Sequence, residues 1–409
     1  MGKNVKRQLP KPSELAPLLQ FSLPTLRRKK RRLEKAYTIW DLRDIAKKRT
    51  PKGPFDYTDG SAESEVSLER ARQAYRDLEF IPSILKDVST ADLTRTALGE
   101  TFAMPLGIAP TGFTRMMQTE GEIAGARAAE KFGIPFTLST LGTTTIEDVV
   151  AAAPGGRNWF QLYMWKDREG SMALVERAKR AGVKNLVLTV DVPAAGQRIR
   201  DYRNGLTVPP RLTAGTILNA IPRPAWWMNF LTTPSIEFAS MKNWEGTVGE
   251  LLDYMFDPTM TWEDLKWIRK QWDGTLTVKG IQNLEDAKMA AKLGADAILL
   301  SNHGGRQLDR APIMLHLLAD IKKEFKKDYE IHIDTGIMHG ADVLAAVALG
   351  AQFTYVGRAY LYGLMAGGQD GVERALEIMR TQMVRNMKLL GVNSLDELTP
   401  KHVRFLNRQ

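Results

Sequence analysis

The 409-residue chain contains no cysteine, which excludes disulfide bonds, thiolate metal sites and cysteine nucleophiles. Its five histidines are scattered, and none stands in a His-Glu-x-x-His or similar spacing, so the sequence predicts no metal site. No apolar run approaches the roughly 20 residues of a membrane-spanning helix. The first residues are not followed by the apolar core of a signal peptide. These absences predict a cytoplasmic protein.

Positive charge is the most prominent feature of the composition. The net charge is +10, and basic residues follow one another without interruption from Arg27 to Arg32. Such a block attracts anionic lipid by ~1 kcal/mol per residue, attracts nucleic-acid phosphate, or forms a solvated arm. No nucleic-acid motif and no interleaved aromatic residues accompany it, so we expect no nucleic-acid partner. Contact with an anionic membrane, on the inner face of the cell membrane, and a solvated arm both stay open.

The residue patterns divide the chain into a basic arm at 1–36, a helical segment at 37–100 that covers the rest, and a large domain at 101–409 with an insertion at about 205–263. The arm lacks helical or strand periodicity. Thr38 can cap a helix that runs through Lys48. Pro51 and Pro54 then break the chain before the next segment.

Beyond residue 100, short apolar segments alternate with amphipathic ones. The candidate strands are Met104–Ala109, Ile134–Leu138, Trp159–Tyr163, Asn185–Val190, Leu276–Lys279, Ala297–Leu300, Glu330–Ile333 and Phe353–Val356. The candidate helices between them include Glu120–Lys131, Ser171–Arg180, Leu284–Lys292 and Gly340–Leu349. Eight strands in this alternation predict an α/β fold, a (β/α)8 TIM barrel. A doubly wound open sheet is the alternative, but no Gly-x-Gly-x-x-Gly follows the first strand.

One long interruption separates the fourth and fifth strands, from Asn204 to about Asp264. It contains Pro209-Pro210 and the cluster Ala225–Leu231, which includes two adjacent tryptophans. A connection this long without clear periodicity is expected to be functional, as a lid or a docking surface. Adjacent tryptophans suit an interface that is half apolar and half wet. A simple cover for the barrel rim, or a contact between subunits, is the other interpretation.

The run Ser301–Asp309, Ser-Asn-His-Gly-Gly-Arg-Gln-Leu-Asp, directly follows the strand that ends at Leu300. The C-terminal ends of strands are where parallel α/β folds keep their chemistry. His303 can move a proton near neutral pH, and Arg306 offers a planar fork of donors suited to a carboxylate. The run therefore predicts a carboxylate-bearing substrate that loses a proton.

In a barrel, all strand ends converge on one mouth, so the polar residues at these ends predict a single pocket. In strand order they are Pro110, Thr111 and Gly112; Ser139; Gln161 and Tyr163; Thr189, Asp191 and Arg198; Lys279; His303 and Arg306; Asp334 and Gly336; Gly357 and Arg358. A core made only for stability would not collect so many charged side chains.

Several motifs resemble those of the FMN-dependent α-hydroxy-acid oxidases and dehydrogenases, from about Tyr37 to the C-terminus. They are Tyr57 in Phe-Asp-Tyr, Gln161-Leu-Tyr163, Thr189-Val-Asp191 with Gly196-Gln-Arg198, Val278-Lys279-Gly280, and the run Ser301–Asp309. Within that family the chain is most similar to the bacterial L-lactate dehydrogenases that pass electrons to a quinone or another acceptor. The resemblance implies FMN as cofactor and a homotetramer.

Oxidation of a 2-hydroxy acid requires a grip on the carboxylate, removal of a proton, and an electron acceptor that no side chain can supply. Arg198 and Arg306 would hold the carboxylate. His303 would be the base, and Asp191 would stabilise the imidazolium that forms. These roles look like those of the family.

The resemblance also implies that Tyr57 and Tyr163 hydrogen-bond the substrate oxygen, and that Lys279 lies at the N1 and C2-oxygen edge of the flavin. The residues expected to bind FMN are Pro110, Thr111, Gly112, Ser139, Gln161, Thr189, Lys279, Asp334, Gly336, Gly357 and Arg358. The FMN phosphate is expected near Gly336, Gly357 and Arg358, at the seventh and eighth strand ends.

Met338 and Gly112 stand where some members of the family carry other residues. The family commonly has Asp-Gly-Gly-x-Arg-Arg-Gly, whereas this chain has Asp334-Thr-Gly-Ile-Met338-His339-Gly340, so an arginine that would neutralise phosphate is missing. His339 or another base would then have to compensate. Gly112 stands where several oxidases carry alanine, which favours a dehydrogenase.

The sequence thus predicts oxidation of an L-2-hydroxy acid, L-lactate to pyruvate, with electrons passed to a quinone or another acceptor than oxygen. An oxidase that makes hydrogen peroxide is one alternative. A dehydrogenase of a larger 2-hydroxy acid, or of a peptide-derived redox cofactor precursor, is another, because Leu141 and Ala195 are not bulky aromatics. A basic scaffold protein without enzymatic activity is a third alternative. It would be colourless, whereas an FMN enzyme is yellow.

Overall fold

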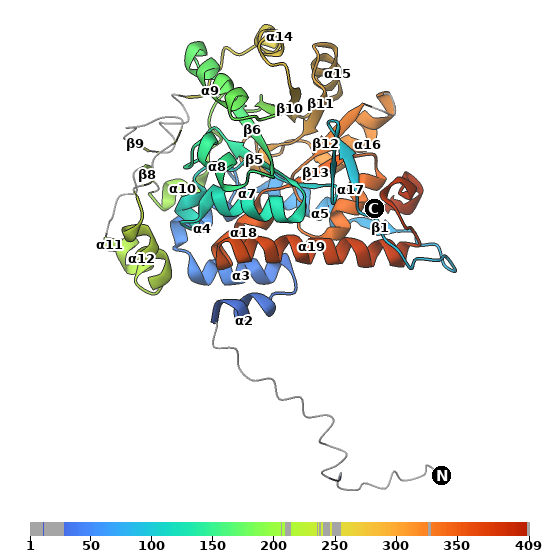
Figure 1. Ribbon diagram of the computed structural model, residues 1–409, viewed down its shortest axis with the longest axis horizontal. Helices are drawn as coiled ribbons and strands as arrows, with labels where there is room; N and C mark the ends of the chain where they lie inside the picture. The colour runs from blue at the N-terminus through green and yellow to red at the C-terminus, as the bar shows by residue number, and fades with distance from the viewer. Residues whose placement is uncertain are drawn as a thin grey trace.

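The computed structural model describes Lys11 and residues 28–205, 207–208, 214–234, 236, 239, 246–247, 255–325 and 329–406. Its centre is a closed barrel of eight parallel strands, visible in Figure 1. In spatial order these are β4 (Leu106–Ile108), β5 (Pro135–Ser139), β6 (Arg157–Tyr163), β7 (Asn185–Thr189), β10 (Thr275–Ile281), β11 (Ala297–Leu300), β12 (Glu330–Ile333) and β13 (Phe353–Val356). β13 pairs with β4 and closes the barrel.

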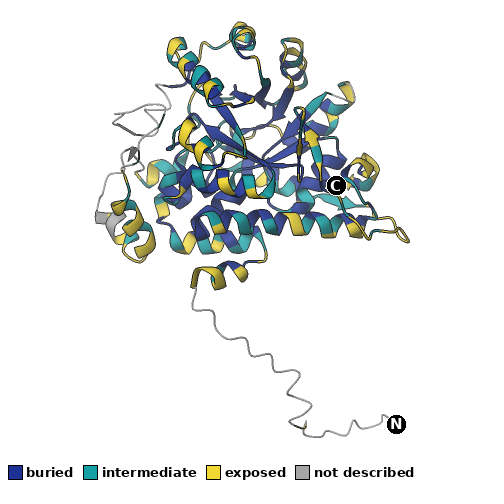
Figure 2. Cartoon of the chain, viewed as in Figure 1, coloured by how far each residue is buried: buried dark blue, intermediate teal, exposed yellow. Residues whose placement is uncertain are grey.

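The (β/α)8 barrel predicted from the sequence is confirmed, and the open sheet is wrong. The helices that surround the strands are α7 (Gly121–Phe132), α8 (Ile146–Ala152), α9 (Arg168–Arg180), α14 (Trp262–Gln271), α15 (Leu284–Lys292), α16 (Met314–Glu324), α17 (Gly340–Ala348) and α18 (Arg358–Gly367). The strands are buried almost throughout, as the dark blue centre of Figure 2 shows. Strands buried on both faces read as continuous apolar runs, which is why they are recognisable from the sequence.

A hairpin closes the N-terminal end of the barrel. Its strands are β2 (Arg95–Ala97) and β3 (Glu100–Phe102), paired antiparallel. The ring of Phe102 lies 5.9 Å from that of Trp159 and 5.2 Å from that of Phe353, two residues near the starts of β6 and β13. The hairpin therefore fills the N-terminal end, and the opposite end of the barrel is the one available to a ligand.

Helices before and after the barrel stack against one side of it (Figure 1). The N-terminal ones are α2 (Arg28–Glu34), α3 (Ile39–Arg49), α4 (Lys52–Asp59) and α5 (Val66–Arg76). The C-terminal region contains α19 (Gln369–Leu390), the 3-10 helices η3 (Leu395–Glu397) and η4 (Pro400–His402), and β14 (Val403–Phe405), which pairs with β1 (Leu78–Phe80). The cap predicted at Thr38 is present, with its hydroxyl accepting from the Asp41 backbone N–H at 3.1 Å.

Two sequence predictions fail in the N-terminal part. The arm was expected to lack helix up to residue 36, yet α2 forms within the basic run, because Leu33 is buried and an Arg32 guanidinium nitrogen donates to the Ala366 carbonyl at 2.9 Å. Pro54 was expected to break the chain, yet it lies inside α4. Proline is tolerated in the first turn of a helix, where its missing N–H has no partner to lose.

The insertion after the fourth barrel strand also contains helices. α6 (Thr114–Met117) belongs to the first barrel connection, and α10 (Ile199–Arg203) lies just before the insertion. The insertion contributes β8 (Thr207–Val208), α11 (Ala214–Ala220), α12 (Pro224–Thr232) and β9 (Gly246–Thr247). β8 and β9 pair antiparallel, with Val208 opposite Gly246. The Trp226 indole N–H donates to the Met116 carbonyl at 2.9 Å, which joins α12 to α6. In the described residues, no helix combines the length and the apolar character needed to cross a bilayer.

Candidate active site

A pocket opens at the C-terminal ends of the barrel strands. The sequence-predicted residues that line it are Tyr57, Pro110, Thr111, Gly112, Tyr163, Arg198, Lys279, His303, Arg306, Asp334, Gly336, Gly357 and Arg358. The predicted residues Ser139, Gln161, Thr189 and Asp191 do not line it, and their side chains are buried at or just beyond the ends of β5, β6 and β7. The structure therefore brings most of the predicted site into one cavity.

The backbone after β11 turns sharply and presents His303 to this pocket. His303, Gly304 and Gly305 have φ angles of 59°, 66° and 75°, and the first of them is an uncommon conformation for a residue with a side chain. A Cβ at Gly305 would lie 2.9 Å from the Leu68 backbone nitrogen, so glycine is required there. The His303 N–H donates to the Ser301 hydroxyl at 3.0 Å, which fixes the start of the turn.

The imidazole of His303 lies between a carboxylate and a phenol. Its Nδ1 is 3.1 Å from Asp191 Oδ1, and its Nε2 is 3.3 Å from the Tyr163 hydroxyl. Because an ionised carboxylate only accepts hydrogen bonds, Nδ1 carries the proton and Nε2 has the free lone pair. The Tyr163 ring stacks on the imidazole with an interplanar angle of 17° and holds it from one side.

The surroundings keep His303 neutral and Asp191 ionised. Burial lowers the pKa of His303, and the nearby Lys279 and Arg306 lower it further, against the opposite effect of Asp191. Burial favours protonation of Asp191, but His303, whose imidazole donates to this carboxylate, and the charge of Lys279 outweigh it and lower the pKa of that carboxyl. A neutral imidazole beside a buried carboxylate is the arrangement of a general base.

Two guanidinium groups lie over one aromatic ring on the other side of the pocket. The Arg306 guanidinium carbon is 4.5 Å from the centre of the Tyr57 ring, and that of Arg198 is 5.3 Å from it. Arg306 also donates to the Tyr57 carbonyl, and Arg198 pairs with Asp201 at 3.4 Å. Burial and the charge of Arg198 lower the pKa of Arg306. Two close, partly uncompensated cations favour an anionic ligand between them.

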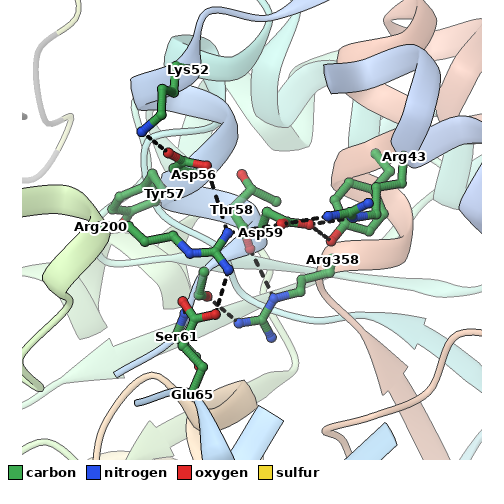
Figure 3. Close-up of polar contacts among 12 residues, drawn as sticks. Arg43, Lys52, Asp56, Tyr57, Thr58, Asp59, Ser61, Glu65, Arg200 and Arg358 are labelled. Atoms are coloured by element: carbon green, nitrogen blue, oxygen red, sulfur yellow. Dashed lines mark hydrogen bonds and ion pairs between the residues drawn. The ribbon is translucent and has the colours of Figure 1, made fainter. Parts of the chain in front are cut away.

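A network of ion pairs holds α4, and with it Tyr57, against the barrel (Figure 3). Asp59 is its centre. Arg43 Nε lies 2.6 Å and Arg200 Nη1 3.1 Å from this carboxylate, and the Tyr362 hydroxyl donates to it at 2.7 Å. Burial favours protonation of Asp59, but the hydrogen bonds from Arg43 and Tyr362 lower its pKa to about 2. Arg200 lies on α10, two residues after Arg198, so the network also connects the segment that carries Arg198 to α4.

Lys279 lies near the end of the fifth barrel strand, β10, and is almost fully buried. Its ammonium donates to the Ser301 hydroxyl at 2.9 Å and lies 3.5 Å from Asp334 Oδ2. The Thr335 hydroxyl donates to Asp334 Oδ1 at 2.7 Å and accepts from the Gly304 N–H at 3.2 Å. The ends of three neighbouring strands are thereby connected around a single fixed positive charge.

Unpartnered polar atoms at the strand ends suit the polar edge of a flavin ring. The side-chain nitrogen of Gln161 and the hydroxyl of Thr189 are buried without a hydrogen-bond partner. The Ser139 hydroxyl donates to the Gln161 oxygen at 3.0 Å and orients that amide. Such groups are costly unless a ligand satisfies them. At Gly112 a Cβ would lie 2.7 Å from that of Leu141, so this wall of the pocket has no room for a larger residue.

The opposite part of the pocket suits a phosphate. Gly357 precedes the first residue of α18, and a Cβ there would meet only the Thr111 methyl at 3.7 Å, so ligand atoms can approach the N-terminus of this helix. Arg358 donates to the carbonyls of Thr58, Gly304 and Gly60, at 2.9, 2.8 and 2.6 Å. An arginine has five donor hydrogens, so Arg358 retains donors for a phosphate. The residues present therefore fit FMN.

Met338 and His339 differ in whether they reach the pocket. Met338 lines the pocket, as expected from the altered motif. His339 does not line it: its Nδ1 accepts from the Ala341 N–H at 2.9 Å and caps α17. Arg72 of α5 does line the pocket, and its Nη2 is buried without a partner. The basic residue that faces this region is thus Arg72, which lies outside the motif.

Three residues of the site escaped the sequence analysis. Ser301 contacts both Lys279 and the His303 backbone, but its position in the predicted run gave no indication of this. Phe256 packs edge-on against the Tyr163 ring at 5.1 Å, and it comes from the end of the insertion, far from any strand end. Arg72 follows the pattern of an ordinary surface helix. Only spatial proximity distinguishes these residues.

Comparison with known families gives a match over most of the chain. The model of the family described as FMN-dependent dehydrogenase matches residues 46–405. A Mycobacterium tuberculosis protein named "Putative L-lactate dehydrogenase" is 58% identical over 99% of this chain and 98% of its own. An L-lactate dehydrogenase of Vibrio cholerae is 40% identical over 88% of this chain and 96% of its own.

Solved structures agree with these matches. The monotopic membrane protein (S)-mandelate dehydrogenase superposes with a TM-score of 0.87 at 35% identity, covering 91% of this chain and 100% of that one. A flavocytochrome b2 variant with pyruvate bound superposes with a TM-score of 0.78 at 30% identity, over 91% and 87% of the two chains.

Proposed function

The chain belongs to the family of FMN-dependent dehydrogenases, and from this premise we propose that it oxidises L-lactate to pyruvate and passes the electrons to a quinone. That it is an FMN-dependent oxidoreductase acting on hydroxy acids follows from the family. The choice of L-lactate, the acceptor and the roles of the individual residues are the content of the proposal.

The observation that carries the proposal is the placement of His303 opposite two arginines in one pocket. The imidazole has its free lone pair on Nε2, and Arg198 and Arg306 lie around Tyr57 in the same cavity. A 2-hydroxy acid has its carboxylate one bond from the carbon that is oxidised. A ligand whose carboxylate lies between the arginines can therefore offer its α-carbon or hydroxyl to the base.

In this proposal, His303 takes the proton at Nε2 and becomes an imidazolium, and the buried Asp191 carboxylate stabilises the new charge. Tyr163 and Tyr57 hydrogen-bond the substrate oxygen. FMN, when bound, supplies the two-electron acceptor that no side chain provides. Gln161, Thr189 and Lys279 would hold its ring, and Gly336, Gly357 and Arg358 its phosphate.

The proposed substrate follows from the pocket wall and from the relatives. Leu141 and Phe256 are the apolar side chains near Tyr163 that would meet the substituent on the α-carbon. Two relatives that cover 99% and 88% of this chain are named for L-lactate. A second candidate, a larger acid such as mandelate, is supported by the similarity to (S)-mandelate dehydrogenase.

Peripheral attachment to a membrane is part of the proposal. The helices α11 and α12 expose Leu218, Met228 and Leu231, whose exposed fractions are 69, 53 and 65%. Figure 2 shows this pair of helices at one edge of the molecule with many exposed residues. The solved structure of (S)-mandelate dehydrogenase described as monotopic supports the same interpretation. A quinone dissolved in the bilayer would then be within reach of the protein.

An anaerobic stopped-flow experiment tests the proposed activity. Mixing the yellow protein with L-lactate is expected to bleach the flavin band, whereas D-lactate leaves it unchanged. Reduced protein is then mixed with a quinone analogue or with oxygen, and fast reoxidation by the quinone alone is expected. Bleaching by L-mandelate and not by L-lactate would replace the substrate, and rapid stoichiometric peroxide formation would replace the acceptor.

A further inference from the structure

A second cavity lies outside the barrel, on the side where α12 meets the N-terminal helices. Its volume is about 240 Å³. It is formed by residues from α2, α3, α6 and the loop after it, α12 and the end of α18. In Figure 1 these elements meet at the corner of the molecule occupied by α2, α3 and α12. None of its lining residues lines the pocket at the barrel mouth.

The lining is strongly basic and incompletely neutralised. Lys29, Arg32, Arg49 and Arg115 contribute four cations, and Glu120 is the single carboxylate. Among the residues that the structure describes, only Lys29 of these four has an ion-pair partner, Asp370 at 2.7 Å. The other three cations come from three different elements and reach the same cavity without a carboxylate.

The arginines also have unused hydrogen-bond donors. Nε of Arg32 and Nε of Arg49 are buried, and neither has a hydrogen-bond partner. Burial lowers the pKa of both residues, and the charge of Arg49 lowers that of Arg32 further. Glu120 does not pair with either arginine in the described structure: its oxygens accept from the Gln369 N–H at 2.8 Å and from the Gln118 side-chain amide at 3.2 Å. Buried unpaired cations are unfavourable unless an anion joins them.

The cavity has an apolar edge that continues onto exposed surface. Trp226 and Phe230 of α12 line it, and their rings stack at 5.0 Å. On the same helix, Met228 and Leu231 are more than half exposed. A basic cavity next to exposed apolar side chains matches a phospholipid, whose phosphate lies next to its acyl chains.

We propose that this cavity, here called the α12 anion pocket, binds a phosphate group through Arg32, Arg49 and Arg115, and that an anionic phospholipid is its source. Guanidinium groups suit this role because their donors match the oxygens of phosphate in pairs. The lipid source rests on the membrane attachment proposed above, whereas phosphate binding does not. Occupancy would fix α12 against α2 and α3.

The test measures binding of the intact holoenzyme to phosphatidylglycerol-containing vesicles by flotation, with pure phosphatidylcholine vesicles as reference. Arg49→Gln is compared with Arg31→Gln, which removes the same charge from an exposed position on α2. Loss of a surface charge weakens binding by about fivefold. Loss of a pocket arginine is expected to weaken it by about tenfold more, since donated hydrogen bonds are lost as well.

Inorganic phosphate separates a lipid source from a soluble one. The thermal midpoint of the wild-type protein is expected to be higher in phosphate than in chloride of equal ionic strength, and Arg49→Gln is expected to abolish the difference. A phosphate effect without a specific loss of vesicle binding would keep the pocket and replace lipid by a soluble phosphate compound. No phosphate effect, together with equal losses in Arg49→Gln and Arg31→Gln, overturns the proposal.

Flavin bleaching by L-lactate is recorded on the same samples. Arg49→Gln is expected to bleach as the wild type does, because Arg49 lies outside the barrel mouth. If Arg49→Gln loses phosphate binding and the wild type is not reduced by L-lactate, the proposed activity is refuted and the anion pocket stands. The two proposals can thus fail separately.

Discussion

His303 combines a strained backbone with a fully specified hydrogen-bond environment. Its φ of 59° is maintained by the hydroxyl of Ser301, and its ring is oriented by Asp191 and Tyr163. These contacts place the lone pair of Nε2 toward the pocket. We therefore expect substitution of His303 to change the rate of flavin reduction and to leave the fold intact.

The substitution His303→Gln tests this directly. We expect the variant to retain FMN, because His303 is not needed to satisfy Gln161 or Thr189, and to lose flavin reduction by about 10²-fold or more, the scale of a general base. Anaerobic stopped-flow absorbance measures the rate. Normal reduction of the flavin in this variant would remove His303 from the role of base.

The pH profile gives an independent check on the same residue. Burial lowers the pKa of His303, so its neutral form persists below the ordinary histidine value, and the acid limb of kcat/KM is expected below pH 6.5. Asp191 raises that pKa, so Asp191→Asn is expected to move the limb to still lower pH while reducing the maximum rate. A limb that moves upward in Asp191→Asn would contradict the proposed pairing.

Met338 and Arg72 allow a test of cofactor affinity. Met338 lines the pocket where the resemblance leads us to expect an arginine, and Arg72, whose Nη2 has no hydrogen-bond partner, lines the same pocket. We expect Arg72→Gln to weaken FMN binding by about tenfold, since a charge-assisted hydrogen bond is lost. Met338→Arg is expected to tighten it. Dialysis against limiting FMN, followed by fluorescence titration, gives both dissociation constants.

The site residues that lie at the ends of barrel strands could be predicted from the sequence. Tyr163, Asp191 and Lys279 follow apolar runs whose ends must converge in a barrel, and their residue types are those of acid-base chemistry. Phe256 was not predictable, because it reaches the pocket from the end of a long insertion. Arg72 was missed for a different reason: a basic residue on an amphipathic helix normally faces water.

At the scale of secondary-structure elements, α4 is the segment whose position depends most on charge. It brings Tyr57 to the pocket, and the carboxylate of Asp59 connects it to Arg43 and Arg200 (Figure 3). The side chain of Asp59 is 5% exposed, so these pairs are far less screened than surface ones. Loss of the central carboxylate would leave the two arginines facing one another.

We therefore expect Asp59→Asn to destabilise the protein by roughly 3 kcal/mol, the scale for removing one partner of a buried pair. The pKa of Asp59 in the folded protein is about 2, below the ordinary value of 3.8. Its contribution is therefore complete above about pH 4 and is lost as the pH falls toward the folded value. The difference between wild type and variant should shrink over that range.

Urea denaturation at several pH values measures this difference. Asp44→Asn is the matched control, because Asp44 also faces Arg43, at 3.9 Å, but is 70% exposed. The control is expected to change stability by less than about 1 kcal/mol. Equal effects of the two substitutions would mean that Asp59 is not the centre of the network.

Helices and strands could be predicted from the sequence where their residues are fully buried. The strands β7 and β11 are apolar at every interior position, so their ends could be placed within a residue or two. α2 could not be found in this way, because five of its seven residues are basic and only Leu33 is buried. Its stability comes from packing on α18, which no local pattern reveals.

At the scale of the whole molecule, the insertion contains a short antiparallel pair of strands, β8 and β9. Val208 lies opposite Gly246, so residue 208, near the start of the insertion, lies beside residue 246 further along it. Antiparallel strands in this arrangement can be joined by a two-residue turn. The long connection between them is therefore removable in principle without pulling the barrel apart.

We predict that replacing residues 209–245 by Asn-Gly leaves FMN bound and flavin reduction by L-lactate within about threefold of wild type, because the barrel mouth keeps its strand-end residues. Binding to phosphatidylglycerol vesicles is expected to be lost, together with α11 and α12. Flotation and flavin absorbance measure the two properties. The double substitution Met228→Gln and Leu231→Gln, with the insertion in place, isolates the apolar contribution.

The closure of the barrel has a consequence for how the chain is made. β4 and β13 are the first and last strands of the sheet, and they are hydrogen-bonded to each other. During synthesis the N-terminal strands leave the ribosome first, but the seam between β4 and β13 forms only after residue 356 has emerged. Until then β4 presents a free edge, which is prone to wrong pairing. The nascent chain is thus expected to need protection from aggregation until nearly its whole length is translated.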